Sequence, residues 1–327
     1  MKTALVTGVT GQDGSYAAEL LLGRGYRVVG TVRGASGVRV SSQAARLDHI
    51  ELIEWDLLDQ KKLVEILAHY RPAEIYNFAA YSSGEGMYDD PVGIAEINGL
   101  AVARILEAIR EVDSEVRFCQ ASSAEMFGEA SESPQTENTR FLPRSPYGAA
   151  KAYAHSMVHI YRQRYGLFGC SAILFNHESP RRSLGFVTRK ITHTAAQIKL
   201  GLGDHLALGN LEARRDWGFA GDVVQAMWMM LQQPTASDYV VATGKTHSVR
   251  EFCDAAFAHL DLDYRDFVRK DPAFYRPLEP VQLVGNSHHL NSIGWVPRTD
   301  FRQLVRMMVD EDMRILTQAD RSRHHKY

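Results

Sequence analysis

Apolar and polar positions follow two alternating spacings along the first half of the 327-residue chain. Short apolar runs, typical of buried strands, are followed by stretches with apolar residues three and four positions apart, typical of helices. The predicted strands lie at 3–8, 27–33, 50–57, 74–80, 116–123 and 169–176. The predicted helices lie at 15–26, 61–70, 94–112 and 147–166. This alternation predicts an α/β fold with a doubly wound parallel sheet and right-handed crossovers.

The pattern becomes less regular after about residue 176, where the spacing predicts helices over 187–201 and within 215–233. We expect the second of these helices to return to the sheet. The last third should form a smaller mixed α/β domain over the carboxyl edge of the strands, where α/β proteins bind ligands. The predicted sheet domain and substrate domain are, respectively, 1–175 with about 213–243, and about 176–212 with 244–327.

Composition limits the class of protein. The chain is 45% hydrophobic and 23% charged, which is ordinary for a globular protein. Its net charge of -2 argues against a broad nucleic-acid surface. The three cysteines have neither metal-ligand nor CxxC spacing, and no apolar run reaches membrane-spanning length. No signal peptide is visible. We therefore expect a cytoplasmic protein with no metal, nucleic-acid or membrane partner.

Three glycines, Gly8, Gly11 and Gly14, stand between the first predicted strand and the first predicted helix. Glycines allow the backbone to turn tightly and to approach a pyrophosphate, which the N–H groups of the helix N-terminus then bind. A tight strand-to-helix turn without a ligand is the alternative. Because the glycines have the right context, we expect a Rossmann-type dinucleotide-binding sheet.

The ends of the second and third predicted strands indicate which dinucleotide binds. An acidic residue at the end of the second strand usually holds the ribose 2′-hydroxyl of NAD. The residue here is Arg33, which suits a 2′-phosphate and therefore favours NADP. A solvated surface arginine is the alternative. Asp56 and Leu57 end the third strand and suit adenine, although Asp56 could equally cap the strand end.

Tyr147 and Lys151 are four residues apart and share one face of a predicted helix. An ammonium near a phenol stabilises the phenolate and should lower the pKa of Tyr147. Such a tyrosine can exchange a proton with a substrate hydroxyl. The spacing alone is weak evidence, but its position after a strand that ends in serines strengthens it.

Together these features resemble the extended short-chain dehydrogenase/reductase superfamily, and within it the GDP-mannose 4,6-dehydratase family. The resemblance covers nearly the whole chain. It is carried by "TGQDGSY", "FCQASSAEMFG", "PRSPYGAAKAYA", "ILFNHESPRR", "FVTRKIT", "LGNLEARRDWGFAGD" and "FYRP". "FNHESPRR" and "RDWGFAGD" are far more specific than any glycine pattern.

The resemblance implies a lyase of deoxysugar biosynthesis that uses NADP as a prosthetic hydride carrier. Tyr147 would remove the proton of the sugar 4-hydroxyl while hydride leaves C4. The resulting 4-ketone acidifies the C5 proton, which Glu125 would take while helping to expel the 6-hydroxyl as water. The hydride then returns to C6. The product of GDP-mannose would be GDP-4-keto-6-deoxymannose.

The stretch Ser123-Ala124-Glu125 distinguishes this reaction from simpler ones. "SSA" resembles 4-epimerases at this point, but an epimerase has no use for a base such as Glu125. Ser123 stands where the family usually has threonine and would hydrogen-bond the 4-oxygen. The alternatives are a loop carboxylate paired to an arginine for Glu125, and a backbone cap at a strand end for Ser123.

The resemblance assigns further residues to the two ligands. Besides those named above, its cofactor contacts are Gln12, Asp13, Ala79, Ala80, Tyr147, Lys151, His177 and Arg182. Its substrate contacts are Ser82, Ser123, Asn176, Lys190, Arg215 and Arg276. Several cations from separate segments suit a dianionic diphosphate. Taken alone, His177 would be a structural histidine, and each cation a surface or ion-paired residue.

The chain departs from the family after the fourth predicted strand. The family reads "AAQSHV" there, whereas this chain reads "AAYSSGEGMYDDP", with Tyr81 in place of glutamine. The change alters the shape of the sugar pocket, so another GDP-hexose or a GDP-heptose is an alternative substrate. A GDP-sugar reductase or epimerase and a non-catalytic nucleotide-binding protein are the alternative functions. We expect a homodimer or a homotetramer.

Overall fold

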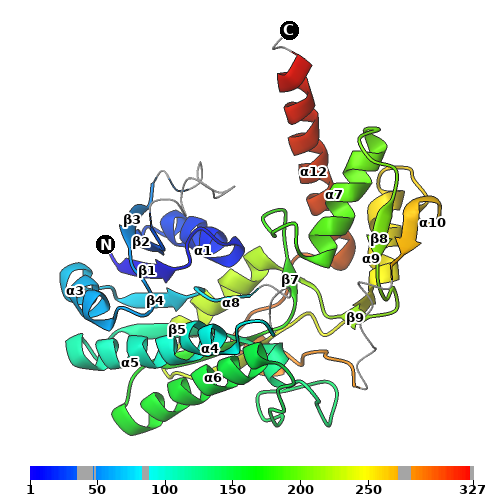
Figure 1. The fold of residues 1–327 in the computed structure, drawn as a ribbon. Helices are drawn as coiled ribbons and strands as arrows, with labels where there is room; N and C mark the ends of the chain where they lie inside the picture. The colour runs from blue at the N-terminus through cyan, green and yellow to red at the C-terminus, as the bar shows by residue number, and fades with distance from the viewer. Residues whose placement is uncertain (35–46, 48, 83–87, 272–280, 325–327) are drawn as a thin grey trace.

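A seven-stranded parallel sheet lies at the centre of the chain (Figure 1). The computed structural model describes residues 1–34, 47, 49–82, 88–271 and 281–324. In spatial order the strands are β11 (Asp238–Val241), β6 (Gly169–Leu174), β5 (Arg117–Ser123), β4 (Glu74–Asn77), β1 (Thr3–Thr7), β2 (Arg27–Val32) and β3 (Glu51–Glu54). The central strands are buried on both faces, which explains their continuous apolar runs.

Helices cover both faces of this sheet, which confirms the predicted doubly wound α/β fold. One apolar core lies beneath α1 (Gln12–Gly23) and α8 (Ala220–Leu231). A second core lies on the opposite face, beneath α3 (Gln60–Tyr70), α5 (Ala101–Val112) and α6 (Pro146–Tyr165). All six strand pairings of the sheet are parallel.

The strand order reverses between β1 and β4. From β1 the chain runs outward through β2 to β3, and it then returns to β4 and runs outward the other way to β11. Leu5 in β1 lies opposite Val29 on one side and Ile75 on the other. In sheets of this kind, ligands bind outside the carboxyl ends of the strands at the point of reversal. The glycine turn after β1 lies at that point.

A third core lies apart from the sheet, between α7 (Val187–Lys199), α9 (Val249–Ala258) and α12 (Phe301–His324). Figure 1 shows α7 and α12 side by side, away from the sheet. The fully buried carboxylate of Asp312 in α12 accepts hydrogen bonds from Arg189 and Thr192 in α7. The remaining elements are α4 (Pro91–Ala95), η2 (Glu96–Leu100), η3 (Ala124–Met126), β7 (His177–Glu178), β8 (Leu206–Leu208), β9 (Arg214–Arg215), β10 (Gly218–Phe219), β12 (His247–Ser248), α10 (Tyr264–Phe267), β13 (Val268–Lys270) and α11 (His288–Ser292).

Two helices differ most from their predicted bounds. α1 begins at Gln12 because the glycine turn itself starts the helix. It ends at Gly23, where Gly25 adopts a φ of 79° and its N–H donates to the Leu22 carbonyl in a C-terminal cap. The helix predicted over 94–112 is interrupted by the π-helical turn η2. Such turns occur frequently at functional sites.

Candidate active site

The glycine turn is too crowded for side chains. Gly8 has a φ of 65°, and a Cβ on it would lie 2.9 Å from the backbone nitrogen of Ala79. A Cβ on Gly14 would lie 2.3 Å from the Gly8 carbonyl oxygen. No side chain caps the N-terminus of α1, where Gly11 is the capping residue. The turn therefore presents bare backbone at the sheet edge, which fits the pyrophosphate of a dinucleotide.

A buried chain of hydrogen bonds fixes the strand ends beside this turn. Thr7 Oγ1 donates to Asn77 Oδ1 at 2.6 Å and accepts from the Ala79 N–H at 3.1 Å. Asn77 Nδ2 donates to Gln120 Oε1 at 2.7 Å. These bonds tie β1, β4 and β5 together and set the position of Ala79, with Ala80 next to it. None of these three polar residues was predicted from the sequence, although Thr7 and Asn77 each end an apolar strand.

The predicted catalytic residues come together where β5 ends and α6 begins. Ser123 Oγ accepts from the Glu125 N–H at 3.2 Å, so Ser123 caps the turn η3 as its alternative interpretation predicted. The same hydroxyl lies close enough to the phenol of Tyr147 to lower its pKa. α6 packs closely on this turn, because a Cβ on Gly148 would lie 2.5 Å from the Glu125 carbonyl oxygen. Ser123, Glu125 and Tyr147 thus form one cluster.

The acid–base state of the pair Tyr147 and Lys151 differs from the prediction. Burial raises the pKa of Tyr147 to about 12, outweighing the nearby Ser123 hydroxyl, which lowers it. Burial lowers the pKa of Lys151 to about 8. The ammonium lies 5.7 Å from the centre of the Tyr147 ring and donates to the Ala121 carbonyl at 2.8 Å. The expectation that Lys151 lowers the phenol pKa is therefore wrong for the chain alone.

Two predicted cofactor residues, Asp13 and His177, form a partly buried ion pair. His177 Nε2 lies 2.9 Å from Asp13 Oδ2, and Nδ1 lies 2.8 Å from the Phe175 carbonyl oxygen. Burial opposes the charge on each group, but the pair interaction lowers the pKa of Asp13 and raises that of His177. Gln12 Nε2 also donates to the His177 carbonyl at 3.2 Å. The glycine turn and the segment after β6 are thus joined directly.

Arg182 lies in the same neighbourhood. Its Nε is 3.2 Å from the buried carboxylate of Glu178, and its guanidinium carbon is 3.5 Å from the centre of the Phe186 ring. Arg182 is therefore part of an ion pair within the chain. The positive charge of Arg182 also lowers the pKa values of Tyr147 and Asp13. Arg182 therefore contributes to the electrostatics of the cluster.

Arg33 and Asp56 lie at the carboxyl ends of neighbouring strands. Arg33 is exposed, and its Nη1 donates to the hydroxyl of Tyr81 at 3.0 Å. Asp56 Oδ1 accepts from the Leu58 N–H at 2.9 Å, which is the strand-end cap foreseen as its alternative role. Leu57 packs against the core under α3. The order β1–β2–β3 places the end of β2 next to the glycine turn and the end of β3 one strand further out.

The predicted substrate residues come from separate segments. Asn176 follows β6, and its carbonyl accepts from the Gly218 N–H at 2.9 Å. Lys190 lies on α7, Arg215 lies on β9, and Ser82 is exposed beyond β4. Arg276 lies outside the described residues, as do 83–87 of the loop that departs from the family.

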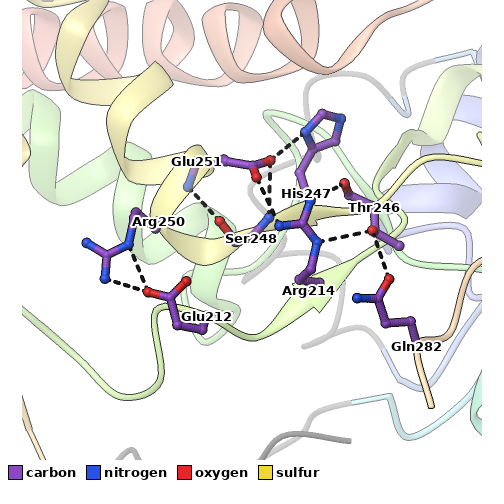
Figure 2. Close-up of polar contacts among 8 residues, drawn as sticks. All are labelled: Glu212, Arg214, Thr246, His247, Ser248, Arg250, Glu251 and Gln282. Atoms are coloured by element: carbon purple, nitrogen blue, oxygen red, sulfur yellow. Dashed lines mark hydrogen bonds and ion pairs between the residues drawn. The ribbon is translucent and has the colours of Figure 1, made fainter. Parts of the chain in front are cut away.

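Arg214, the neighbour of Arg215, was missed by the sequence analysis. Figure 2 shows its side chain directed at Glu251 of α9, with Nη1 3.0 Å from Oε1. The other oxygen of Glu251 lies 2.9 Å from His247 Nδ1, and Arg214 Nη2 donates to the Thr246 carbonyl at 2.8 Å. Since side chains alternate along a strand, anchoring Arg214 on one face of β9 directs Arg215 to the other. The antiparallel pairing of β9 with β12 also holds β9 in place.

Among the described residues, no group of three or more His, Cys, Asp and Glu side chains could hold a metal ion. None of the described helices combines the length and the apolar character needed to cross a membrane.

Comparison with known proteins places the chain in a family. The model of the family described as GDP-mannose 4,6 dehydratase matches residues 5–308. The chain belongs to this family. GDP-mannose 4,6 dehydratase 2 of Arabidopsis thaliana is 46% identical, over 96% of this chain and 87% of the relative. Human GDP-mannose 4,6 dehydratase is 41% identical, over 96% and 92%. Membership confirms the family and the enzyme class, a lyase, that the sequence analysis predicted.

Solved structures confirm the fold of this family member. The UDP-glucose 4-epimerase of Thermus thermophilus in complex with NAD superposes with a TM-score of 0.80, at 27% identity. The match covers 95% of this chain and 98% of the epimerase. A dehydratase-family chain and an epimerase thus share one scaffold, so the reaction has to be argued from the residues of the site.

Proposed function

We propose that the chain is an NADP-dependent GDP-mannose 4,6-dehydratase that forms GDP-4-keto-6-deoxymannose. The observation that carries the proposal is the place of Glu125. Its carboxylate lies close enough to Tyr147 to raise the phenol pKa, and its backbone is fixed by Ser123. A serine, a tyrosine and a lysine suffice for oxidation at one carbon. A separate carboxylate supplies the second base that elimination of water requires.

The sheet edge supports a dinucleotide as cofactor. Its nicotinamide ring supplies a hydride acceptor when bound. Gly8, Gly11 and Gly14 leave backbone N–H groups for the pyrophosphate. The exposed guanidinium of Arg33 at the end of β2 suits the 2′-phosphate that distinguishes NADP from NAD. No acidic residue stands at that strand end.

Proton transfer at the sugar C4 falls to Tyr147. Ser123 is placed to hold the 4-oxygen, because its hydroxyl lies close enough to the phenol to lower its pKa. A pKa of about 12 keeps the phenol protonated at neutral pH in the chain alone. The loaded site therefore has to lower this pKa, and Arg182 is a positive residue of the chain that already acts in that direction.

Elimination falls to Glu125. A ketone at C4 acidifies the neighbouring C5 proton, so a carboxylate can remove it. The protonated Glu125 can then give a proton to the departing 6-hydroxyl, which leaves as water. The carboxylate is regenerated in this way within each turnover. The hydride returns to C6 and C5 takes up one proton, which balances the proton that Tyr147 removed from the 4-hydroxyl, so the reaction needs no external oxidant or reductant.

The cations of the C-terminal part support a nucleotide diphosphate sugar as substrate. Lys190 lies on α7 and Arg215 lies on β9. The contact of Arg214 with Glu251 fixes β9 and thereby directs Arg215 to the opposite face of the strand. A dianionic diphosphate suits such a set. We further propose that the sheet domain, 1–175 with about 213–243, binds the dinucleotide, while about 176–212 with 244–327 binds the nucleotide sugar.

The proposed reaction can be tested without any added reductant. The purified protein, loaded with NADP, is incubated with GDP-mannose, and the alkali-induced absorbance of a 4-keto-6-deoxy sugar is followed. Mass spectrometry should show the loss of one water. Other GDP-hexoses and a GDP-heptose test the alternative substrates. If none of these sugars loses water, the dehydratase assignment is wrong.

A further inference from the structure

The contact between Arg33 and Tyr81 links two strand ends that are not neighbours. Arg33 follows β2 and Tyr81 lies four residues beyond β4, while β1 runs between these strands. Arg33 Nη1 donates to the Tyr81 hydroxyl at 3.0 Å, and its guanidinium carbon lies 5.9 Å from the ring centre. The pair therefore bridges the carboxyl end of β1, where the glycine turn begins.

Tyr81 is held firmly at its backbone. The side-chain amide of Asn98 accepts from the Tyr81 N–H at 2.8 Å and donates to the Tyr81 carbonyl at 2.9 Å. Asn98 is 1% exposed and lies in the π-helical turn η2, which interrupts an otherwise helical stretch. Two hydrogen bonds from a buried amide fix the point from which the phenol extends. The hydroxyl is thus placed by the fold.

Among the described residues, the Arg33–Tyr81 pair has further hydrogen-bond donors without a partner. The phenol oxygen accepts from Arg33, so its own O–H is left to donate, and the guanidinium has four further N–H groups in a planar fork. Arg33 is exposed and Tyr81 is 43% exposed, so an anion can reach both. A guanidinium and a phenol joined in this way match the several oxygens of a phosphate monoester.

We propose that Tyr81 is a residue that determines the preference for NADP over NAD. Tyr81 positions the Arg33 guanidinium at the edge of the glycine turn and donates its own O–H to the 2′-phosphate. The inference rests on the proposed NADP dependence, since it assigns a second residue to recognition of the same phosphate. It predicts that the phenol hydroxyl contributes to binding of NADPH and contributes nothing to binding of NADH.

The test is the affinity of the purified chain for NADPH, NADH and 2′,5′-ADP, measured by titration calorimetry without any sugar. Tyr81→Phe removes the hydroxyl and keeps the ring. Loss of a hydrogen bond to a charged group should weaken the binding of NADPH and of 2′,5′-ADP about tenfold. The affinity for NADH should stay within about twofold of the wild-type value. Tyr153→Phe is the matched control, because Tyr153 is 42% exposed and lies on α6. It should change none of the three affinities.

A double-mutant cycle distinguishes a joint action of Tyr81 and Arg33 from a general effect of Tyr81→Phe on dinucleotide binding. If Tyr81 and Arg33 bind the phosphate together, Tyr81→Phe should weaken NADPH binding far less in a chain that already carries Arg33→Leu. The proposal is overturned if Tyr81→Phe weakens NADPH binding equally in the wild-type and Arg33→Leu backgrounds. It is also overturned if Tyr81→Phe weakens the binding of NADPH and of NADH equally. A wild-type chain that prefers NADPH while Tyr81→Phe does nothing also overturns it, and leaves the NADP assignment intact. Because no sugar is present, failure of the dehydratase reaction does not affect these outcomes.

Discussion

The partly buried ion pair of Asp13 and His177 predicts how stability depends on pH. The ring of His177 faces two acceptors, Asp13 Oδ2 at 2.9 Å and the Phe175 carbonyl at 2.8 Å. Only the imidazolium has an N–H for each of them. The perturbation is Asp13→Asn, which keeps the shape of the side chain and removes its charge.

The signs of the two pKa shifts define the pH window. The pKa of His177 is raised by folding, so its contribution is complete below about pH 6.5 and is lost as the pH rises through the folded value. The pKa of Asp13 is lowered by folding, so its contribution is present above about pH 3.8 and is lost as the pH falls through the folded value. The pair therefore stabilises the chain fully between these two values.

The magnitude follows from burial and charge. The side chains of His177 and Asp13 are 12% and 19% exposed, so solvent screens their interaction little. A hydrogen bond between charged groups contributes about 1.5–3 kcal/mol, and a neutral one about 0.5–1.5 kcal/mol. Asp13→Asn should therefore lower the free energy of unfolding by about 2 kcal/mol at pH 6 and by about 1 kcal/mol at pH 9.

Urea unfolding of both proteins at the two pH values measures this difference, because the other titrating groups cancel between them. Asp204→Asn is the control, since Asp204 and His205 form the same kind of pair at 2.7 Å on the surface. That substitution should cost nothing measurable. If Asp13→Asn cost the same at pH 6 and pH 9, or no more than the control, the argument for a charged, partly buried pair would be refuted.

Three further predictions concern other parts of the structure. Gly14→Ala places a Cβ 2.3 Å from the Gly8 carbonyl oxygen, so it should lower the free energy of unfolding by about 1–3 kcal/mol in urea and abolish dinucleotide binding by calorimetry. Asp312→Asn leaves Arg189 unpaired inside the third core and should cost about 3–5 kcal/mol, also measured in urea. Burial lowers the pKa of Lys151 to about 8, so kcat/KM should fall as the pH rises through 8, and Lys151→Met should lose this limb of the pH profile.

The order of strands and helices could be predicted because burial leaves a local signature. A strand such as β4 is buried along its whole length, and a helix such as α5 has one apolar face. The functional side chains at the ends of such strands and helices could also be predicted. Ser123 ends a strand, Glu125 lies in the turn that follows, and Tyr147 starts a helix, so their approach follows from the topology of the sheet.

Features that depend on tertiary packing could not be predicted. The π-helical turn that carries Asn98 has the same apolar spacing as a regular helix. The contact of Arg33 with Tyr81 depends on the spatial order of β2 and β4, which the chain order alone does not reveal. The predicted direction of the Tyr147 pKa shift was wrong because burial outweighs the nearby charges. Burial is a property of the whole fold and cannot be deduced from the spacing of Tyr147 and Lys151.

The most direct test of the account is a single-turnover measurement on Glu125→Gln with NADP bound and GDP-mannose added. Reduction of the nicotinamide, followed by absorbance, reports oxidation at C4, and mass spectrometry of the quenched sugar reports loss of water. The account predicts that the variant still oxidises C4 and no longer releases water. Release of water at the wild-type rate would contradict the role of Glu125 as the base of the elimination.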